Sequence, residues 1–298
     1  MTKKQKAESC TIQDPIIIDF EDDDLVSLSE TQWEEAAKTK MGKYITKIKI
    51  DVVMWTHNSE KTLTEVLQRI QEVIPSQYIN RKIITEDYSK DKTREIAKDF
   101  GWEVHMNNGR GLHDNTKTAI SLVSAPIFCS FEHDIILARD WWKKISKFME
   151  DPSVVVAQGT RISTNPTFRM LDDYSNKRGD IPHETLDNCI AKTEIVRKFG
   201  YNEVGTPPKL KAEGLKWIVE QTVTSDHIRE SMWENVKHDF RMQSLFSATS
   251  KQRLLCFRIL LTSLIRAAHI VYKTNCSMVL LLYPVDRFAI FLASFKKA

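Results

Sequence analysis

Apolar residues follow two different periods between residues 47 and 158. Short apolar runs, typical of buried strands, lie at residues 48–54, 81–85, 102–106, 127–131 and 154–158. Between them, apolar residues recur every three or four positions, which predicts helices over residues 60–74, 91–100, 112–123 and 141–149. In the first helix this stripe consists of Leu63, Val66, Leu67, Ile70 and Ile74, and Pro75 is predicted to end it.

Strands that alternate with helices predict an α/β fold, in which a mostly parallel sheet is covered by helices on both faces. Ligands of such sheets bind outside the carboxyl ends of the strands. Asp87, the turn at residues 107–111 and the triplet Glu132-His133-Asp134 all follow predicted strands. We therefore expect these three segments to lie together at one edge of the sheet.

Glu132 and Asp134 are candidate metal ligands. Two carboxylates at positions i and i+2 beyond a strand end can both reach one hard cation. Mg²⁺ or Mn²⁺ bound in this way usually keeps open positions for substrate phosphates. Taken alone, the same triplet also fits a solvated turn between a strand and a loop, so the neighbouring segments must decide.

The two ends of the chain differ from its centre. Residues 1–45 are polar and include an acidic run at 21–24, so they are predicted to be a disordered extension. Residues 46–250 form the predicted main domain, whose second half is harder to interpret. It contains a loop-rich stretch at 163–182, a predicted helix at 192–199 and a predicted strand at 217–221.

Residues 251–298 carry eight basic residues and one acid, a charge of +7 in a chain whose total is +3. The polar positions Arg258, Thr262, Arg266, His269 and Lys273 form one stripe on a predicted amphipathic helix. A basic stripe beside a wide apolar face favours an interfacial helix on an anionic membrane surface. The alternative is a helix that packs on the main domain or on a second copy in a homodimer.

The remaining composition excludes several classes of protein. A net charge of +3 gives no general argument for nucleic-acid binding. The five cysteines form no Cys-x-x-Cys pair, which argues against a zinc site or a disulfide framework and fits reduced thiols in the cytoplasm. No apolar segment of a secretory signal follows Met1, and the longest uncharged run near the C-terminus, 274–285, is too short to span a bilayer.

Four segments in this order resemble the family 2 glycosyltransferases, which have the GT-A fold. Residues 51–60, Asp-Val-Val-Met-Trp-Thr-His-Asn-Ser-Glu, are similar to the family's Val-Val-Ile-Pro-Thr-Tyr-Asn-Glu-Glu. Residues 86–93, Glu-Asp-Tyr-Ser-Lys-Asp-Lys-Thr, resemble Asp-Asp-Gly-Ser-x-Asp-x-Thr. Gly109-Arg110-Gly111 and the following helix resemble Gly-x-x-x-Ala-Arg-Asn, although the last three positions read Asn115-Thr116-Lys117. Glu132-His133-Asp134 stands where the family has its Asp-x-Asp metal motif.

The resemblance implies a nucleotide-sugar donor and a divalent cation, Mg²⁺ or Mn²⁺. The donor would contact Thr56, His57, Asp87, Arg110 and Lys117, with Asp87 on the nucleobase. Four of these residues have another interpretation: Asp87 as a turn or cap residue, His57 as a histidine bonded to a carbonyl, and Arg110 and Lys117 as surface cations. The metal would be held by Glu132, Asp134 and a late histidine, His227, which is alternatively structural.

The family's Glu-Asp pair, which carries the general base, is missing, since residues 204–208 read Val-Gly-Thr-Pro-Pro. Glu203 and Glu213 are the nearest alternatives, and with Asp134 they complete the candidate catalytic residues. An alcohol acceptor needs a base, whereas a phosphate acceptor is already an anion. The sequence thus favours an inverting glycosyltransferase on the inner face of a membrane, with a polyprenyl phosphate or another glycolipid as acceptor. The alternatives are a degenerate domain that binds a nucleotide-sugar without turnover, and a sugar nucleotidyltransferase.

Overall fold

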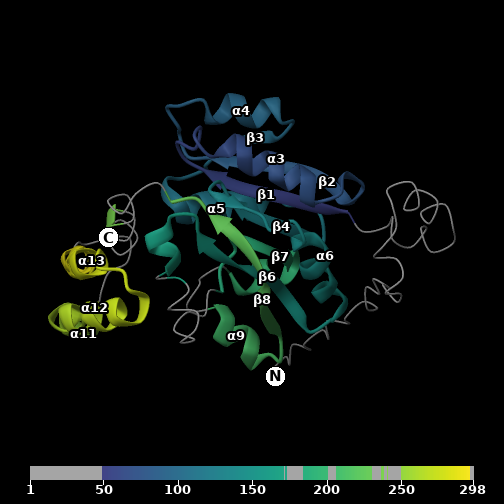
Figure 1. The fold of residues 1–298 in the computed structure, drawn as a ribbon. Coiled ribbons are helices and arrows are strands. Elements are labelled where there is room, and N and C mark those ends of the chain that lie inside the picture. Colours follow the sequence, from purple (N-terminus) through teal and green to yellow (C-terminus); the bar gives the residue numbers. More distant parts are fainter. Residues whose placement is uncertain are drawn as a thin grey trace, which may run out of the picture.

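A single eight-stranded sheet forms the centre of the protein (Figure 1), in a computed structural model that describes residues 49–170, 172, 184–200, 206–229, 236–237, 240 and 250–295. The strands lie in the order β3-β2-β1-β4-β7-β6-β8-β5. Their bounds are β1 Ile50–Thr56, β2 Ile79–Glu86, β3 Glu103–Met106, β4 Ile127–Glu132, β5 Ile135–Ile136, β6 Val154–Ser163, β7 Asn188–Lys192 and β8 Lys216–His227. Only β7 and β5 run against the other strands. The carboxyl ends of the other six strands therefore point to the same edge of the sheet.

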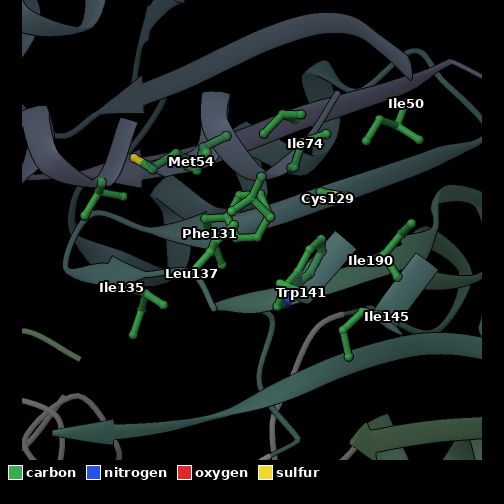
Figure 2. Packing of buried hydrophobic residues seen from close by; sticks show 14 of the residues in the cluster. Ile50, Met54, Ile74, Cys129, Phe131, Ile135, Leu137, Trp141, Ile145 and Ile190 are labelled. Atoms are coloured by element: carbon green, nitrogen blue, oxygen red, sulfur yellow. The ribbon is translucent and has the colours of Figure 1, made fainter. Parts of the chain in front are cut away.

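One face of the sheet is covered by α3 (Leu63–Val73), α4 (Thr93–Asp99) and α6 (Trp141–Ile145). Figure 2 shows the centre of this layer, where Phe131 of β4 lies between Met54 of β1 and Trp141 of α6. The Phe131 and Trp141 rings pack edge to face, with their centroids 5.1 Å apart. The predicted stripe of the first helix is buried as expected, since all five of its members are fully inaccessible: Leu63, Val66, Leu67, Ile70 and Ile74.

The opposite face is covered by α5 (Gly111–Leu122), α8 (Thr193–Phe199) and α9 (Thr206–Ala212). Alternate residues of the strands supply this second core, with Val53 of β1, Ile83 of β2 and Phe128 of β4 among them. Because neighbouring residues of a strand point to opposite faces, β1 and β4 are mostly apolar and bury both sides. The prediction of a sheet with helices on both faces is confirmed.

The predicted strands and helices of residues 48–158 are all present, and Ile74 caps the first helix immediately before Pro75. Two predictions needed correction. The helix expected over 141–149 is a short α-helix followed by the 3-10 helix Ser146–Glu150. The strand expected over 217–221 continues to His227 as β8. The antiparallel strand β7 and the two-residue strand β5 were not predicted, because neither strand itself contains an apolar run of four or more residues. The predicted extension at 1–45 lies outside the described residues.

Three C-terminal helices pack on one another at one side of the sheet, coloured yellow in Figure 1: α11 (Ser250–Leu261), α12 (Ser263–Thr274) and α13 (Val279–Ala293). The single amphipathic helix predicted for 258–273 is wrong, because the chain bends by 55° between α11 and α12. No single helix in the described part of the chain is long and apolar enough to cross a membrane, although α11 and α12 together reach that length and composition as a bent pair. The small core of this unit is Ala267, Ile270, Cys276 and Val279, against which Met170 also packs.

Asp51 is a buried carboxylate that joins β1 to the connection between α5 and β4. Its Oδ2 accepts hydrogen bonds from the backbone amides of Ser124 and Ala125, and its Oδ1 accepts one from Asn80 at 2.9 Å. Burial alone would raise the pKa of Asp51, but these hydrogen bonds to the ionised form outweigh it and hold the pKa below its usual value. The folded state therefore favours the ionised carboxylate.

We expect Asp51→Ala to lower the free energy of unfolding by about 3 kcal/mol, because it leaves buried amide donors unpaired. Exposed Asp99→Ala is the control and should change it by less than about 0.5 kcal/mol. The pKa is lower in the folded state, so the stabilisation is complete above the unfolded pKa of about 3.9 and is lost as pH falls below it. Urea denaturation from pH 7 to pH 3 measures both effects. Equal acid sensitivity of the parent and Asp51→Ala would contradict the assignment.

Candidate active site

The pairing of β5 with the end of β8 brings Asp134 and His227 together. Asp134 occupies the turn between β4 and β5, and the next residue, Ile135, is paired with His227. The amide of Ile228 donates to the carbonyl of Asp134 at 2.8 Å. Residues 93 positions apart in the sequence thus share one edge of the sheet. The predicted proximity of Asp134 and His227 is observed.

The side chain of His227 lies between those of Asp134 and Arg229. Its Nε2 lies 3.2 Å from Asp134 Oδ2, and the Nε of Arg229 donates to its Nδ1 at 3.3 Å. A guanidinium can only donate, so Nδ1 is the acceptor and the imidazole proton lies on Nε2, from which it is donated to Asp134. Burial tends to raise the pKa of Asp134, but His133, His227 and Arg161 together hold that pKa well below its usual range. Asp134 is therefore an anion at neutral pH.

The residues present fit a divalent cation at Asp134. Its second oxygen, Oδ1, is buried and makes no hydrogen bond, as expected of a carboxylate oxygen reserved for a ligand. Mg²⁺ is commonly held by one or two carboxylates together with substrate phosphates, and an imidazole beside the carboxylate suits Mn²⁺. Ligation by His227 would require its Nε2 to give up the proton that it now shares with Asp134.

Glu132 does not join this pair. Its Oε2 faces the guanidinium of Arg161, with 3.9 Å between Oε2 and Nη1. Within the described ranges, no group of three His, Cys, Asp or Glu side chains is arranged to hold a metal ion. The predicted set of Glu132, Asp134 and His227 is therefore not assembled as a three-residue cluster. The reason is the strand geometry: Glu132 is the last residue of β4, whereas Asp134 lies beyond the strand in the turn.

Several charged residues near this pair were not found by sequence reasoning. Arg161 of β6 also forms a close ion pair with Asp187, whose carbonyl accepts the amide of Glu132 at 3.0 Å. Asp172 accepts the amide of Ser163 at 2.8 Å, and burial raises its pKa although Arg229, His227 and Arg161 oppose that shift. Asp187 directly precedes β7. The apolar run Cys189-Ile190-Ala191 was the available signal for that strand.

The donor side of the site is built from two turns that bind each other. The amides of Asn58, Ser59 and Glu60 donate to side chains of the 86–93 segment: Ser89 Oγ at 2.8 Å, Thr93 Oγ1 at 2.7 Å and Asp91 Oδ2 at 3.0 Å. In return, the amides of Lys90 and Lys92 donate to Asn58 Oδ1 and Glu60 Oε2. The loop after β1 and the loop after β2 are thus fixed as one rigid unit.

Asp87 connects this unit to the turn before α5. Its Oδ1 accepts the side-chain amide of Asn107 at 2.9 Å, and its Oδ2 accepts the backbone amide of Gly111 at 2.8 Å. Gly111 has φ +82°, a conformation that favours glycine, and a Cβ at Gly109 would collide with Asp114. Both carboxylate oxygens therefore serve as turn acceptors, and the predicted contact with a nucleobase would have to use the remaining lone pairs of Asp87.

The other residues predicted to bind the donor differ in how far they are buried. Thr56 is buried, and its carbonyl accepts from the amide of Asp87 and the side chain of Asn115. His57 is exposed and its Nδ1 donates to the Asp87 carbonyl at 2.7 Å, as the alternative interpretation of this histidine expected. Arg110 and Lys117 are exposed. The structure thus brings His57, Asp87 and Arg110 to one edge, whereas Thr56 supports that edge from inside. Their roles toward a donor stay predictions.

Only one of the two alternative general bases, Glu213, belongs to the described residues. Glu203 lies outside the described residues. Glu213 is exposed in the turn before β8, whose first residue, Lys216, pairs with Val154 at the start of β6, whereas His227 pairs with Ser163 at its end. A strand of 12 residues separates the two ends, which is more than about 30 Å at 3.3 Å per residue. Glu213 therefore lies near the amino end of β8, at the opposite end of the strand from His227 and Asp134, and is too far away for a reaction there.

Comparisons with known proteins agree with this architecture. The mannosyltransferase PcManGT from Pyrobaculum calidifontis, solved with GDP-Man and Mn²⁺, is 15% identical, covers 83% of this chain and 75% of its own, and has a TM-score of 0.53. A mycobacterial protein is 15% identical, with a TM-score of 0.50 and coverage of 67% and 72%. Glucosyl-3-phosphoglycerate synthase from Mycobacterium tuberculosis is 14% identical, with a TM-score of 0.48 and coverage of 67% and 77%. No curated protein matches this chain in sequence.

The mixed sheet, with its helices on both faces and the acidic turn after β4, defines a GT-A fold, the class of nucleotide-diphospho-sugar transferases. The family model of glycosyl transferase family 2 matches residues 51–202, which is half of the chain. The protein belongs to glycosyl transferase family 2.

We expect Asp87→Ala to release the turn before α5, because two donors lose their acceptor together. The amide of Gly111 should exchange with solvent roughly tenfold faster or more, corresponding to the loss of one hydrogen bond to a charged group. Asp114→Ala, which removes another acceptor in the same turn at Arg110, is the matched control and should leave the Gly111 amide protected. Hydrogen exchange followed by NMR measures this. Unchanged protection of Gly111 in Asp87→Ala would show that the clamp is not needed.

Proposed function

We propose that the protein transfers a sugar, with inversion at the anomeric carbon, from a nucleotide-sugar donor that it binds together with Mg²⁺ or Mn²⁺. The observation that carries the proposal is the pair of Asp134 and His227 at the carboxyl edge of the sheet, where one buried carboxylate oxygen is unpaired. PcManGT, which shares the fold, was solved with a nucleotide-sugar and Mn²⁺. The Asp87 clamp lies at the same edge, at the end of β2.

Each side chain of the site has a definite task in this reaction. Asp134 and His227 would hold the cation, which when bound neutralises the charge that develops on the leaving nucleoside diphosphate. The joined loops after β1 and β2 would bind the nucleoside, and Arg110 would face the diphosphate, because guanidinium matches phosphate oxygens. An acceptor oxygen would then attack the anomeric carbon from the side opposite the leaving group.

The acceptor that fits best is a phosphate. Of the two carboxylates proposed from sequence as a base, Glu203 lies outside the described residues, and Glu213 is at the far end of β8 from Asp134. A phosphate oxygen attacks as an anion and needs no base. Arg161 and Arg229, both beside the Asp134–His227 pair, add positive charge on that side. A polyprenyl phosphate or another lipid phosphate combines this chemistry with the C-terminal helices.

Those helices carry most of the exposed apolar surface of the described chain. Of sixteen exposed large hydrophobic side chains, thirteen lie on residues 254–295, and Leu261, Leu264 and Ile265 are 64–74% exposed. The cations Arg258, Arg266 and Lys273 are exposed among them. A contiguous apolar surface with interspersed cations suits the headgroup region of an anionic bilayer. We therefore assign this unit as a peripheral anchor on the cytoplasmic leaflet. Packing on a second copy of the chain is the alternative that the test below distinguishes.

One short segment after β6 links this unit to the site. Met170, which packs against the core of the C-terminal helices, follows β6 by seven residues. The amide of Thr164, the residue after β6, donates to the carbonyl of His227 at 2.9 Å. A membrane contacted by the helices would consequently be near the edge at which Asp134 lies. This supports a lipid acceptor over a soluble one.

A degenerate domain that binds a nucleotide-sugar without turnover is the second candidate. It is favoured by the missing Glu-Asp pair and by Glu132, which faces Arg161 instead of Asp134. The two functions differ in one measurement: release of nucleoside diphosphate from a nucleotide-sugar in the presence of polyprenyl phosphate. Multiple turnovers support the enzyme, and binding of the donor without release supports the degenerate domain.

Asp134→Asn should abolish the Mn²⁺-dependent thermal stabilisation by nucleoside diphosphates, because it removes the anionic ligand and keeps the shape of the side chain. The measurement is a thermal-shift screen of nucleoside diphosphates with and without Mn²⁺. Asp140→Asn, six residues along and paired with Lys144 at 2.7 Å, is the matched control and should respond like the parent.

The unfolding midpoint of Asp134→Asn without ligand should stay within a few degrees of the parent, which separates loss of the site from loss of the fold. An equal shift of Asp134→Asn and the parent by nucleoside diphosphate with Mn²⁺ would refute the role of Asp134.

Replacing Arg258, Arg266 and Lys273 together by Gln should release the full chain from anionic liposomes, because the attraction depends on these cations. Binding of the parent should also fall as salt rises, since surface charges are screened within about 8–10 Å at physiological ionic strength. The control replaces three exposed lysines of the main domain, Lys143, Lys147 and Lys209, by Gln, which is the same change in charge at a distance from the helices. Liposome co-sedimentation at several salt concentrations measures the effect.

Equal liposome binding by both triple variants would contradict the anchor. Binding that resists both high salt and alkaline extraction would show that the bent pair α11 and α12 is embedded in the bilayer and not bound at its surface. Concentration-dependent dimerisation without liposome binding would support the alternative of a second copy.

A further inference from the structure

Three exposed apolar side chains remain when the C-terminal helices are set aside. Among the described residues they are Tyr88, Met106 and Leu112, exposed by 42%, 40% and 37%. All three adjoin Asp87. Tyr88 is the next residue, Met106 pairs with Glu86 across β2 and β3, and Leu112 follows Gly111, whose amide binds Asp87. The apolar surface of the main domain is therefore concentrated at the proposed donor site.

Tyr88 has a backbone conformation that is unusual for a large residue. Its φ is +57°, in the left-handed region where glycine is the favoured residue. The family pattern Asp-Asp-Gly-Ser, to which residues 86–89 are similar, has glycine at this position. The neighbouring contacts enforce the conformation: the amide of Ser89 donates to Glu86 Oε1, and Ser89 Oγ accepts the amide of Asn58 at 2.8 Å. Such strain in a loop at a binding edge suggests that the side chain has a use.

The ring of Tyr88 is held in a fixed place. Its hydroxyl donates to the carbonyl of Asn107 at 3.3 Å, and the guanidinium of Arg110 lies over the ring, 4.6 Å from Cζ to the ring centroid. Asn107 is in turn bound to Asp87. The ring and the guanidinium thus form a pair of flat groups at the turn that Asp87 clamps. Flat groups of this kind bind planar aromatic ligands by stacking.

We propose that the ring of Tyr88, held in place by Arg110, forms a stacking platform for the nucleobase of the donor. The proposal rests on the proposed function and adds a residue that determines donor affinity. The apolar face of a nucleobase matches the exposed side chains of Tyr88, Met106 and Leu112. Its polar edge matches the carboxylate of Asp87. Stacking on an aromatic side chain tolerates different bases, so the platform supplies affinity, and the choice of base depends on the hydrogen bonds around it.

Two substitutions separate the ring from the strain. Tyr88→Gly removes the ring and relieves the positive φ, whereas Tyr88→Ala removes the ring and retains a Cβ in the left-handed conformation. Both should weaken binding of nucleoside diphosphates with Mn²⁺ roughly tenfold or more, while Tyr88→Phe should stay within about threefold, since it keeps the ring. The unfolding midpoint of Tyr88→Gly should exceed that of Tyr88→Ala, because only glycine adopts this φ without strain.

Inorganic pyrophosphate with Mn²⁺ is the ligand without a base. Its affinity should be the same for the parent and Tyr88→Gly, because Arg110 is retained in both proteins and the ring of Tyr88 does not contact the phosphates. Isothermal titration calorimetry of both ligands against all four proteins measures this.

Three results would contradict the stacking platform. Equal affinity of the parent and Tyr88→Gly for nucleoside diphosphates would overturn the platform and leave the proposed function intact. An equal loss of pyrophosphate affinity would overturn stacking in favour of a phosphate contact near Arg110. Failure of the parent to bind any nucleoside diphosphate would overturn the platform together with the proposed function.

Discussion

The pairing of a two-residue strand with the end of β8 is the constraint on which the site depends. Ile135 and Ile136 of β5 pair with His227 and Asp226, so the chain leaving β4 must cross to the far edge of the sheet. The crossing places Asp134 beside His227 and buries one oxygen of its carboxylate. Ile135 is fully buried in the core that contains Phe131 and Trp141, so the turn between β4 and β5 is anchored by apolar packing as well as by hydrogen bonds. The charged groups are thus placed by the hydrophobic core beneath them.

The predicted donor edge is also held in a fixed position, but by hydrogen bonds between loops instead of apolar packing. There the loops after β1 and β2 and the turn before α5 are joined almost entirely by side chains that accept or donate to backbone groups. Because loops cannot use the ladder of a sheet, their backbone amides need such partners. Asp87 contributes most, with both oxygens occupied by donors from the 107–111 turn. Replacing a carboxylate that fixes the shape of the site can change donor affinity even if the carboxylate does not contact the donor. The conformation of the 107–111 turn therefore has to be measured separately from donor binding.

Much of the fold could be predicted from sequence because its elements are long and periodic. The strands β1 and β4 are mostly apolar because helices cover both of their faces. The apolar stripe of α3 is regular because one face of this helix packs on the sheet. The site was only partly predictable, for physical reasons. His227 was found through a family resemblance, whereas Arg161, Asp172 and Asp187 were missed, because their positions depend on β7 and on the full length of β8. The bend between α11 and α12 was missed because a continuous apolar and basic pattern does not show where the helix breaks. Glu132 was grouped with Asp134 and stays a predicted ligand, but spacing along the chain does not reveal that its carboxylate faces Arg161.

The departures from the family pattern at the donor edge are connected to each other. His57 donates to the carbonyl of Asp87, Asn115 to that of Thr56, and Tyr88 to that of Asn107. Each replacement thus adds a hydrogen bond to a backbone carbonyl in the same three loops. Loss of function by drift would leave new polar groups without partners, and Trp55, whose buried indole nitrogen is unpaired, is such a case. His57, Asn115 and Tyr88 instead tighten the edge, and Tyr88, with its positive φ, presents a ring at its surface. The altered motif therefore joins a strained residue with an exposed ring to a connected set of hydrogen bonds, and this arrangement supports the proposed donor site over a degenerate one.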